Sequence, residues 1–329
     1  MEARSQPPTP DQPKDKGLVV ELLQTLKLFF GAIFVGIWRF FVPPPRKSVF
    51  GEIVLITGAG SGIGRQLARE FAKLGAELVL WDINETSNAE TARQLREEFH
   101  AKCSPYTVDV GDKSQIERTA QRVKTEVGEV NILINNAGVV SGKKFINTPD
   151  VLVERTFDVN LLAHFWTVKC FLPSMLKNNH GHIVNIASST GLVGLNRLTD
   201  YSASKFGVVG FTEVLNYEII FSGYRGVHTT LVCSSYVKTG MFAGCKMRFP
   251  WLLPALEVEN TTNRIMQGIL TNQYIICIPR LVYFLSYLKV ILPVDAFLEV
   301  VKFFGAATFM DTYVGKEANA LIHQNGSSN

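Results

Sequence analysis

The sequence EIVLITGAGSGIG, at residues 52–64, decides the fold of this chain. Its first half is an apolar run that predicts a buried strand, and its second half places four glycines in a turn that leads into a helix. Glycines in such a turn let backbone amides approach a pyrophosphate at the N-terminus of the helix. The spacing differs from GxGxxG, but the strand–turn–helix order predicts a dinucleotide-binding unit. We expect the cofactor-binding turn to comprise Gly58, Ser61, Gly62, Ile63 and Gly64.

The next apolar stretch, residues 78–81, ends at an acidic residue, Asp82. A carboxylate at this position accepts hydrogen bonds from ribose hydroxyls and would repel a 2′-phosphate. No arginine follows Asp82 closely that could accept such a phosphate. The sequence therefore predicts NAD rather than NADP, the alternative being that Asp82 is a solvated acid at a strand end.

Apolar strand patterns and helical patterns alternate along the rest of the domain. We expect strands at residues 104–108, 130–134, 182–186, 227–232 and 274–278, and helices at 87–99, 114–127, 151–176, 201–222 and 257–271. This alternation predicts an α/β protein, a Rossmann-type doubly wound parallel sheet of about seven strands. Ligands bind at the carboxyl ends of such strands. The polar and glycine residues at those ends are Gly58, Asp82, Asp109, Asn135 and Ser188.

Tyr201 and Lys205 are four residues apart on a predicted helix, so both lie on one face of it. A nearby ammonium group lowers the pKa of a phenol and makes it a usable proton donor or acceptor. Ser188, thirteen residues upstream of Tyr201, could hydrogen-bond the same substrate oxygen. These residues are typical of a site that moves a proton while a cofactor moves a hydride.

An apolar segment precedes the nucleotide-binding pattern. It extends from residue 18 to 42 and is interrupted by Glu21, Lys27 and Arg39. Its length and Trp38 suit a membrane anchor that either spans the bilayer or lies in its interface. A cleaved signal peptide or a helix packed on the protein itself are the alternatives. Basic residues on its C-terminal side predict that the catalytic domain faces the cytosol.

The composition of the chain argues against several other classes of protein. The 329-residue chain carries a net charge of +4, and 47% of its residues are hydrophobic, which excludes a disordered protein. Positive and negative side chains are mixed without a basic patch, so we expect no nucleic-acid partner. The five cysteines are scattered without a CxxC pair. We therefore expect reduced thiols, with neither a disulfide framework nor a metal site.

The motifs taken together resemble the classical short-chain dehydrogenase/reductase family over about residues 50–280. The resemblance rests on the glycine-rich turn, Asn135-Asn136-Ala137-Gly138, Asn160, Ser188 and Tyr201-x-x-x-Lys205. Finer texture, such as Leu80-Trp81-Asp82-Ile83-Asn84 and Lys238-Thr239-Gly240-Met241-Phe242, is similar to the membrane-anchored subgroup that contains epidermal retinol dehydrogenase 2 and the lipid-droplet 17β-hydroxysteroid dehydrogenases.

The resemblance implies a role for each matching residue. Tyr201 would be the general acid/base, Lys205 would lower its pKa and hold the nicotinamide ribose, and Ser188 would orient the substrate oxygen. Asn160 would hold a water in a proton relay. Other cofactor contacts would come from Asp109, Val110 and Asn136 on the adenosine side and from Thr239 at the nicotinamide carboxamide. The chain departs from the family where a proline usually follows the sixth strand, since it has Ser234-Ser235 there.

The resemblance also implies NAD-dependent oxidation of a lipophilic alcohol, a homodimer, and a location at the endoplasmic reticulum membrane or the lipid droplet. All-trans-retinol is our first candidate substrate, a 17β-hydroxysteroid the second, and a fatty or isoprenoid alcohol the third. Many large apolar residues between 236 and 310 suit such a substrate. A non-catalytic lipid-droplet scaffold protein is the alternative of a different class.

We expect four parts in the chain: a disordered tail (1–16), a membrane anchor (17–45), the catalytic domain (46–280), and an apolar extension with a polar tail (281–329). Residues 281–305 are too often interrupted by charges and proline to span a bilayer. This segment could be a membrane-surface patch, a cap over the pocket or a subunit interface.

Overall fold

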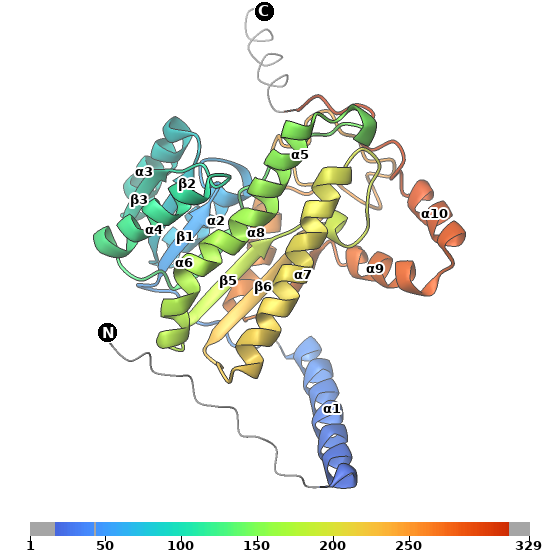
Figure 1. The fold of residues 1–329 in the computed structure, drawn as a ribbon, viewed down its shortest axis with the longest axis horizontal. Coiled ribbons are helices and arrows are strands. Elements are labelled where there is room, and N and C mark those ends of the chain that lie inside the picture. Colours follow the sequence, from blue (N-terminus) through green and yellow to red (C-terminus); the bar gives the residue numbers. More distant parts are fainter. Residues whose placement is uncertain (1–16, 43, 316–329) are drawn as a thin grey trace, which may run out of the picture.

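The computed structural model describes residues 17–42 and 44–315, and the predicted terminal tails lie outside these residues. Seven strands form one sheet in the order β3-β2-β1-β4-β5-β6-β7 (Figure 1). Every neighbouring pair is parallel. The order reverses between β1 and β4, which creates the crevice where doubly wound folds bind ligands. The predicted fold class is confirmed.

The elements lie within two or three residues of their predicted bounds, apart from one helix described below. The strands are β1 (Ile53–Thr57), β2 (Glu77–Asp82), β3 (Cys103–Thr107), β4 (Ile132–Asn135), β5 (Gly181–Ile186), β6 (Val227–Ser234) and β7 (Ile275–Ile278). The helices of the domain are α2 (Gly62–Lys73), α3 (Glu85–Phe99), α4 (Lys113–Glu126), α5 (Asp150–Phe157), α6 (Ala163–Lys177), α7 (Thr199–Phe221) and α8 (Val258–Leu270).

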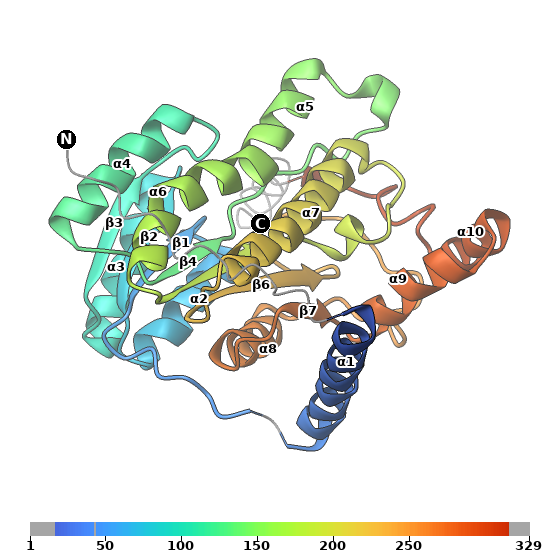
Figure 2. The same cartoon turned by 60° about the horizontal axis from the view of Figure 1, so that its bottom comes forward.

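Helices cover both faces of the sheet because its strands are apolar on both sides (Figure 2). Helices α2, α3 and α8 pack on one face and build a core with β1 and β2. Helices α4, α6 and α7 pack on the other, where Trp81 of β2 contacts Phe171 of α6. These two cores fix the strand ends that carry the polar residues.

The single helix predicted over residues 151–176 is wrong in one respect. It is divided into α5, a π-helical turn at Asp158–Leu162, and α6. Within this turn the buried Asn160 side chain bonds the backbone of Val139, on the loop after β4. A π turn inserts one residue and re-aims those around it, and the apolar pattern of the sequence does not reveal such an insertion.

Helix α1 (Leu18–Phe41) projects away from the domain (Figure 1). The 22-residue stretch Leu18–Arg39 is long and apolar enough to cross a membrane, and none of its most apolar window is buried in the protein. The alternative that this helix packs on the protein's own surface is therefore wrong. An exposed apolar helix of this length indicates membrane association.

The apolar extension forms two helices, α9 (Leu281–Ile291) and α10 (Val294–Phe303), beyond the β7 edge of the sheet (Figure 2). Tyr283 of α9 ties this pair to the sheet, because its hydroxyl donates to the Ile275 carbonyl of β7 at 2.8 Å. Lys289 donates to the Leu192 carbonyl at 3.2 Å. Both contacts hold α9 against the domain.

Candidate active site

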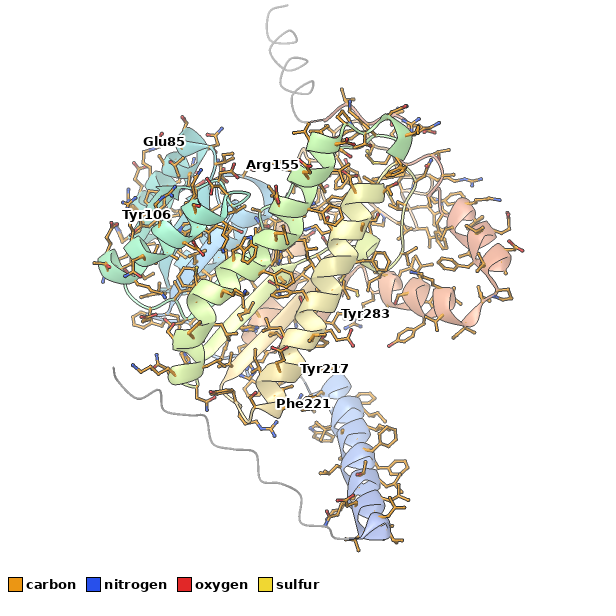
Figure 3. All side chains as sticks on the ribbon, in the orientation of Figure 1. Glu85, Tyr106, Arg155, Tyr217, Phe221 and Tyr283 are labelled. Atoms are coloured by element: carbon orange, nitrogen blue, oxygen red, sulfur yellow. The ribbon has the colours of Figure 1, made fainter. Side chains whose placement is uncertain are left out.

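A cavity of about 1240 Å³ opens along the carboxyl ends of the strands. It lies on the same edge as Arg155 of α5, labelled in Figure 3. One part is lined by the glycine-rich turn and the ends of β2 and β3, and the other part by apolar residues from the α9–α10 region. The predicted site residues that line it are Gly58, Ser61, Gly62, Ile63, Asp82, Asp109, Val110, Asn136, Ser188, Tyr201, Lys205 and Thr239.

The glycine-rich turn is shaped to receive a phosphate group. Gly58 and Gly62 have positive φ angles of 67° and 54°, which side-chain-bearing residues rarely adopt. Ser61 precedes α2 without capping it by its side chain, so the first amides of this helix point into the cavity region unclaimed by a cap. A Cβ on Gly64 would lie 2.1 Å from the Gly58 carbonyl oxygen. The residues present therefore fit a dinucleotide pyrophosphate.

Asp82 at the end of β2 holds this turn in place. One carboxylate oxygen accepts from the Gly60 amide at 2.8 Å, and the other accepts from the Asn84 amide at 2.9 Å. Arg65, which the sequence analysis did not consider, is the nearest cation on α2. Its guanidinium donates to the Gly60 carbonyl and to the Thr91 hydroxyl, and Arg65 does not line the cavity. The end of β2 therefore presents a carboxylate, while Arg65 is bonded to the Gly60 carbonyl and the Thr91 hydroxyl, which fits NAD.

Asp109 forms a bidentate ion pair with Arg155, at 2.8 and 2.9 Å. A Cβ on Gly111 would meet the Arg155 guanidinium, so this glycine leaves room for the pair. Sequence reasoning found Asp109 but missed Arg155, because the two are 46 residues apart and no local motif joins them. The pair closes the cavity wall between β3 and α5.

Asn136 braces the loops around the glycine-rich turn. Its side-chain amide donates to the carbonyls of Thr57 and Gly58, at 2.9 and 3.2 Å. The Thr57 hydroxyl in turn accepts from the backbone amides of Asn136 and Ala137. Asn136 thus lines the cavity, and the hydrogen bonds of its side-chain nitrogen hold the end of β1 beside the end of β4.

Ser188, Tyr201 and Lys205 come together where the two parts of the cavity meet. Ser188 follows β5 and hydrogen-bonds Tyr201 of α7. Thr190 points to Ser188 as well, since both its amide and its hydroxyl reach Ser188 Oγ, at 3.2 and 3.0 Å. Because Ser188 Oγ accepts both of these hydrogen bonds, its own proton is free to point toward Tyr201. Sequence reasoning did not anticipate Thr190.

The electrostatics of the pair differ from expectation. Burial raises the pKa of Tyr201 to about 12, and the Ser188 hydrogen bond opposes that rise. Burial lowers the pKa of Lys205 to about 8. The Lys205 ammonium donates to the Ile186 carbonyl at 2.8 Å. Ser188 is the group that favours the ionised phenol.

Asn160 lies beneath the cavity rather than in its wall. Its side-chain oxygen accepts from the Val139 amide at 2.8 Å, and its amide donates to the Val139 carbonyl and to Ser204. Ser204 in turn donates to the Tyr201 carbonyl. The Asn160 side chain therefore connects the loop after β4 to the helix that carries Tyr201.

The apolar part of the cavity surrounds Tyr201 with aromatic rings. Phe242 packs edge-to-face on Tyr201, and Tyr236 and Phe309 pack on Phe242. The large apolar residues between 236 and 310 that line the cavity include Met241, Phe242, Leu253 and Phe304. Others, such as Trp251 and Phe284, are exposed instead. Further lining residues from α9, α10 and the chain beyond are Val282, Leu285, Val301 and Phe309.

Comparison with known proteins agrees with this geometry. The family model of the short chain dehydrogenases matches residues 52–247. Human epidermal retinol dehydrogenase 2 is 49% identical over 276 residues, which cover 84% of this chain and 89% of that protein. Rat retinol dehydrogenase 10 is 45% identical over 330 residues, covering 92% of this chain and 96% of that protein.

A solved structure gives the same fold with a cofactor bound. A short chain dehydrogenase/reductase from Burkholderia phymatum in complex with NAD aligns with a TM-score of 0.68 and 28% identity. The alignment covers 77% of this chain and 96% of that one. A short-chain dehydrogenase from Sphingobium yanoikuyae in complex with NADPH aligns with a TM-score of 0.64 and 25% identity. Proteins with this fold are thus found with either cofactor bound.

Proposed function

This chain belongs to the short-chain dehydrogenase family, and we propose that it oxidises all-trans-retinol to all-trans-retinal with NAD as hydride acceptor. The observation that carries the proposal is the position of Ser188, Tyr201 and Lys205. They lie at the junction between a pyrophosphate-binding turn and an aromatic-lined cavity. A hydroxyl bound there faces a proton acceptor on one side and the cofactor part of the cavity on the other.

Bound NAD would supply the hydride acceptor, held by the glycine-rich turn and Asp82. The chain's own residues do the rest. The Ser188 hydroxyl hydrogen-bonds the substrate oxygen and fixes its orientation. Tyr201 in its ionised form takes the hydroxyl proton, while the hydride leaves the carbinol carbon. Lys205 holds a positive charge below the phenol, and Asn160 fixes the loop and helix that position Tyr201.

The size and chemistry of the cavity support a lipophilic substrate. Its inner part is lined by aromatic and aliphatic side chains from four separate segments, including Tyr236, Phe242, Val301 and Phe309. Burial of a long apolar chain against them is favourable at about 25 cal/mol per Å² of apolar surface. Among lipophilic alcohols we choose retinol because several of the relatives are retinol dehydrogenases.

The test measures NADH formation by membrane fractions that contain the full chain, offered all-trans-retinol and estradiol separately. Tyr201→Phe is the control, because it keeps the ring and removes only the proton acceptor. We expect retinol turnover that falls by about 10²–10⁴-fold in the variant. Turnover of estradiol alone would move the protein to the steroid dehydrogenases. Absence of turnover with both substrates, in protein that binds NADH, would support either a different lipid alcohol as substrate or the non-catalytic scaffold instead.

We further propose that α1 anchors residues 46–280 as a catalytic domain on the cytosolic side of the endoplasmic reticulum membrane or the lipid droplet. The exposed apolar surface of α1 and the basic residues after it support this arrangement. We also propose a homodimer, supported by the exposed apolar side chain of Val214 on α7. Sedimentation of the detergent-solubilised chain, before and after Val214→Glu, would test the dimer.

A further inference from the structure

A second cavity, of about 480 Å³, lies where the chain leaves α1 and enters the domain. Its walls come from the last turn of α1, the linker after it, the start of β6 and the end of α8. The basic residues in these walls are Arg39, Arg46, Lys47 and His228, and none of its described lining residues is acidic. The volume lies in the range of small-molecule sites.

Lys47 is a half-buried residue in the wall of this cavity. Its ammonium lies 2.7 Å from Nδ1 of His182, and Nε2 of His182 lies 2.8 Å from the Thr230 hydroxyl. Burial lowers the pKa of His182 well below its usual value, so the imidazole is neutral and accepts from Lys47. A neutral acceptor leaves the positive charge uncompensated and two of the three ammonium protons available.

The surrounding titratable groups do not neutralise this charge by direct contact. Glu52 raises the pKa of Lys47 through space, but burial outweighs it and lowers that pKa to about 8. The Glu52 carboxylate is itself bonded to His180, at 2.9 Å. Burial also lowers the pKa of His228, as does the nearby charge of Lys47. Among the described residues, no ion pair of Lys47, Arg39 or Arg46 is formed.

The end of α8 does not account for these cations either. Helix C-termini attract positive side chains through their unpaired carbonyls. Here the last four carbonyls of α8 already accept backbone amides: Gln267 from Thr271, Gly268 from Gln273, Ile269 from Asn272 and Leu270 from Lys47. The basic side chains therefore remain available for an anion from outside the chain.

We propose that this cavity binds the phosphate of an anionic phospholipid from the membrane that holds α1. The inference rests on the proposed membrane anchoring. Arg39 lies in the last turn of the apolar helix, which places the cavity at the membrane surface. Tyr217 and Phe221 extend from the same end of the domain (Figure 3) and are 45% and 75% exposed, as suits residues at a lipid interface. Guanidinium groups pair with phosphate in bidentate fashion.

The experiment uses the full chain purified in a neutral detergent and titrated with phosphatidic acid or phosphatidylcholine. Native mass spectrometry counts the lipids that stay bound. We expect one phosphatidic acid to be retained, and the apparent affinity to fall roughly tenfold or more in Arg39→Gln/Arg46→Gln. The matched control, Lys102→Gln/Arg118→Gln, removes two exposed cations from the position before β3 and from α4, outside the cavity, and should bind like the wild type.

Three results would overturn the proposal. An equal loss in the control variant would mean that overall charge, not the cavity, holds the lipid. Equal retention of phosphatidylcholine would exclude recognition of the anionic headgroup. Displacement by inorganic phosphate at the same concentration as the lipid would indicate a soluble anion. Arg46→Gln alone, at an exposed position, replaces the double variant if the latter does not fold.

Flotation of the wild-type chain with phosphatidylcholine vesicles tests the anchoring of α1 separately. Turnover of retinol tests the proposed function, and its outcome does not depend on the lipid-retention measurement or on the flotation measurement.

Discussion

The ammonium nitrogen of Lys205 lies 5.8 Å from the centre of the Tyr201 ring, and both side chains are almost fully buried. The ammonium is held by the carbonyl of Ile186, at the end of β5, rather than by an acidic group. The protein thus keeps a cation beneath its proton-transferring phenol at a cost in desolvation. This cost in desolvation leads to a prediction about stability.

We expect Lys205→Met to abolish turnover yet raise the free energy of unfolding at pH 7 by about 1–3 kcal/mol. The pKa of Lys205 falls to about 8 in the folded protein. The unfolded chain therefore binds more protons than the folded one between about pH 8 and 10.5, and wild-type stability rises with pH in that window. Denaturant unfolding at pH 7 and pH 10.5 measures this. The advantage of the variant should shrink at high pH, and a constant difference would contradict the explanation.

Thr190 should act through Ser188. Because its amide and hydroxyl both reach Ser188 Oγ, we expect Thr190→Val to lower kcat about fivefold, the equivalent of one hydrogen bond of about 1 kcal/mol. Thr190→Ser keeps the hydroxyl and should retain most activity. Steady-state kinetics with retinol compares the two variants with Ser188→Ala, which should lose far more. A full loss in Thr190→Ser would point to packing of the methyl group instead.

Asp82 should decide the choice of cofactor. Asp82→Asn keeps the shape of the residue and removes the charge that repels a 2′-phosphate. We expect the preference for NAD over NADP, measured as the ratio of kcat/KM values, to fall about 10–100-fold. Part of the effect will be a higher KM for NAD, because the carboxylate also holds the Gly60 amide. Arg65→Gln is the matched control and should leave the ratio unchanged, since Arg65 is turned away from the cavity.

The α9–α10 pair should limit the length of the substrate. Val301 of α10 lines the cavity, and Val301→Trp would fill space there. We expect kcat/KM for retinol to fall roughly tenfold, while a short allylic alcohol that reaches only Ser188 and Tyr201 is little affected. Val290→Trp, at an 83% exposed position on α9, is the control. Equal effects on both alcohols would mean that Val301 does not contact the substrate.

Much of the fold follows from local sequence patterns. Strand and helix bounds were predictable because most of the strands are apolar runs and most of the helices have an apolar face. The glycine-rich turn and the Tyr201–Lys205 spacing are local as well, so their positions could be predicted. The π turn at Asp158–Leu162 could not, because it is accompanied by a bond from Asn160 to Val139, 21 residues earlier in the chain, which no local pattern reveals.

The residues of the site could be predicted from the sequence, but the hydrogen bonds and ion pairs that they form could not. The sequence places Asp109 and Asn136 at strand ends, and the structure commits Asp109 to Arg155 and Asn136 to the carbonyls around Gly58. Similarly, the Tyr201–Lys205 spacing predicts a lowered phenol pKa, but burial of Tyr201 raises it. Burial depends on what the rest of the chain packs around a residue, and a spacing rule cannot include it.

By itself, the sequence determined the order of elements, the strand ends that carry polar residues and the apolar length of α1, because each depends on neighbours within a few turns of chain. Only the tertiary structure decided that Thr190 orients Ser188, that α10 closes the substrate cavity, and that Lys47 meets His182, 135 residues away. Such contacts are set by how the layers pack around the sheet, and packing energy is shared among residues that are distant in the chain.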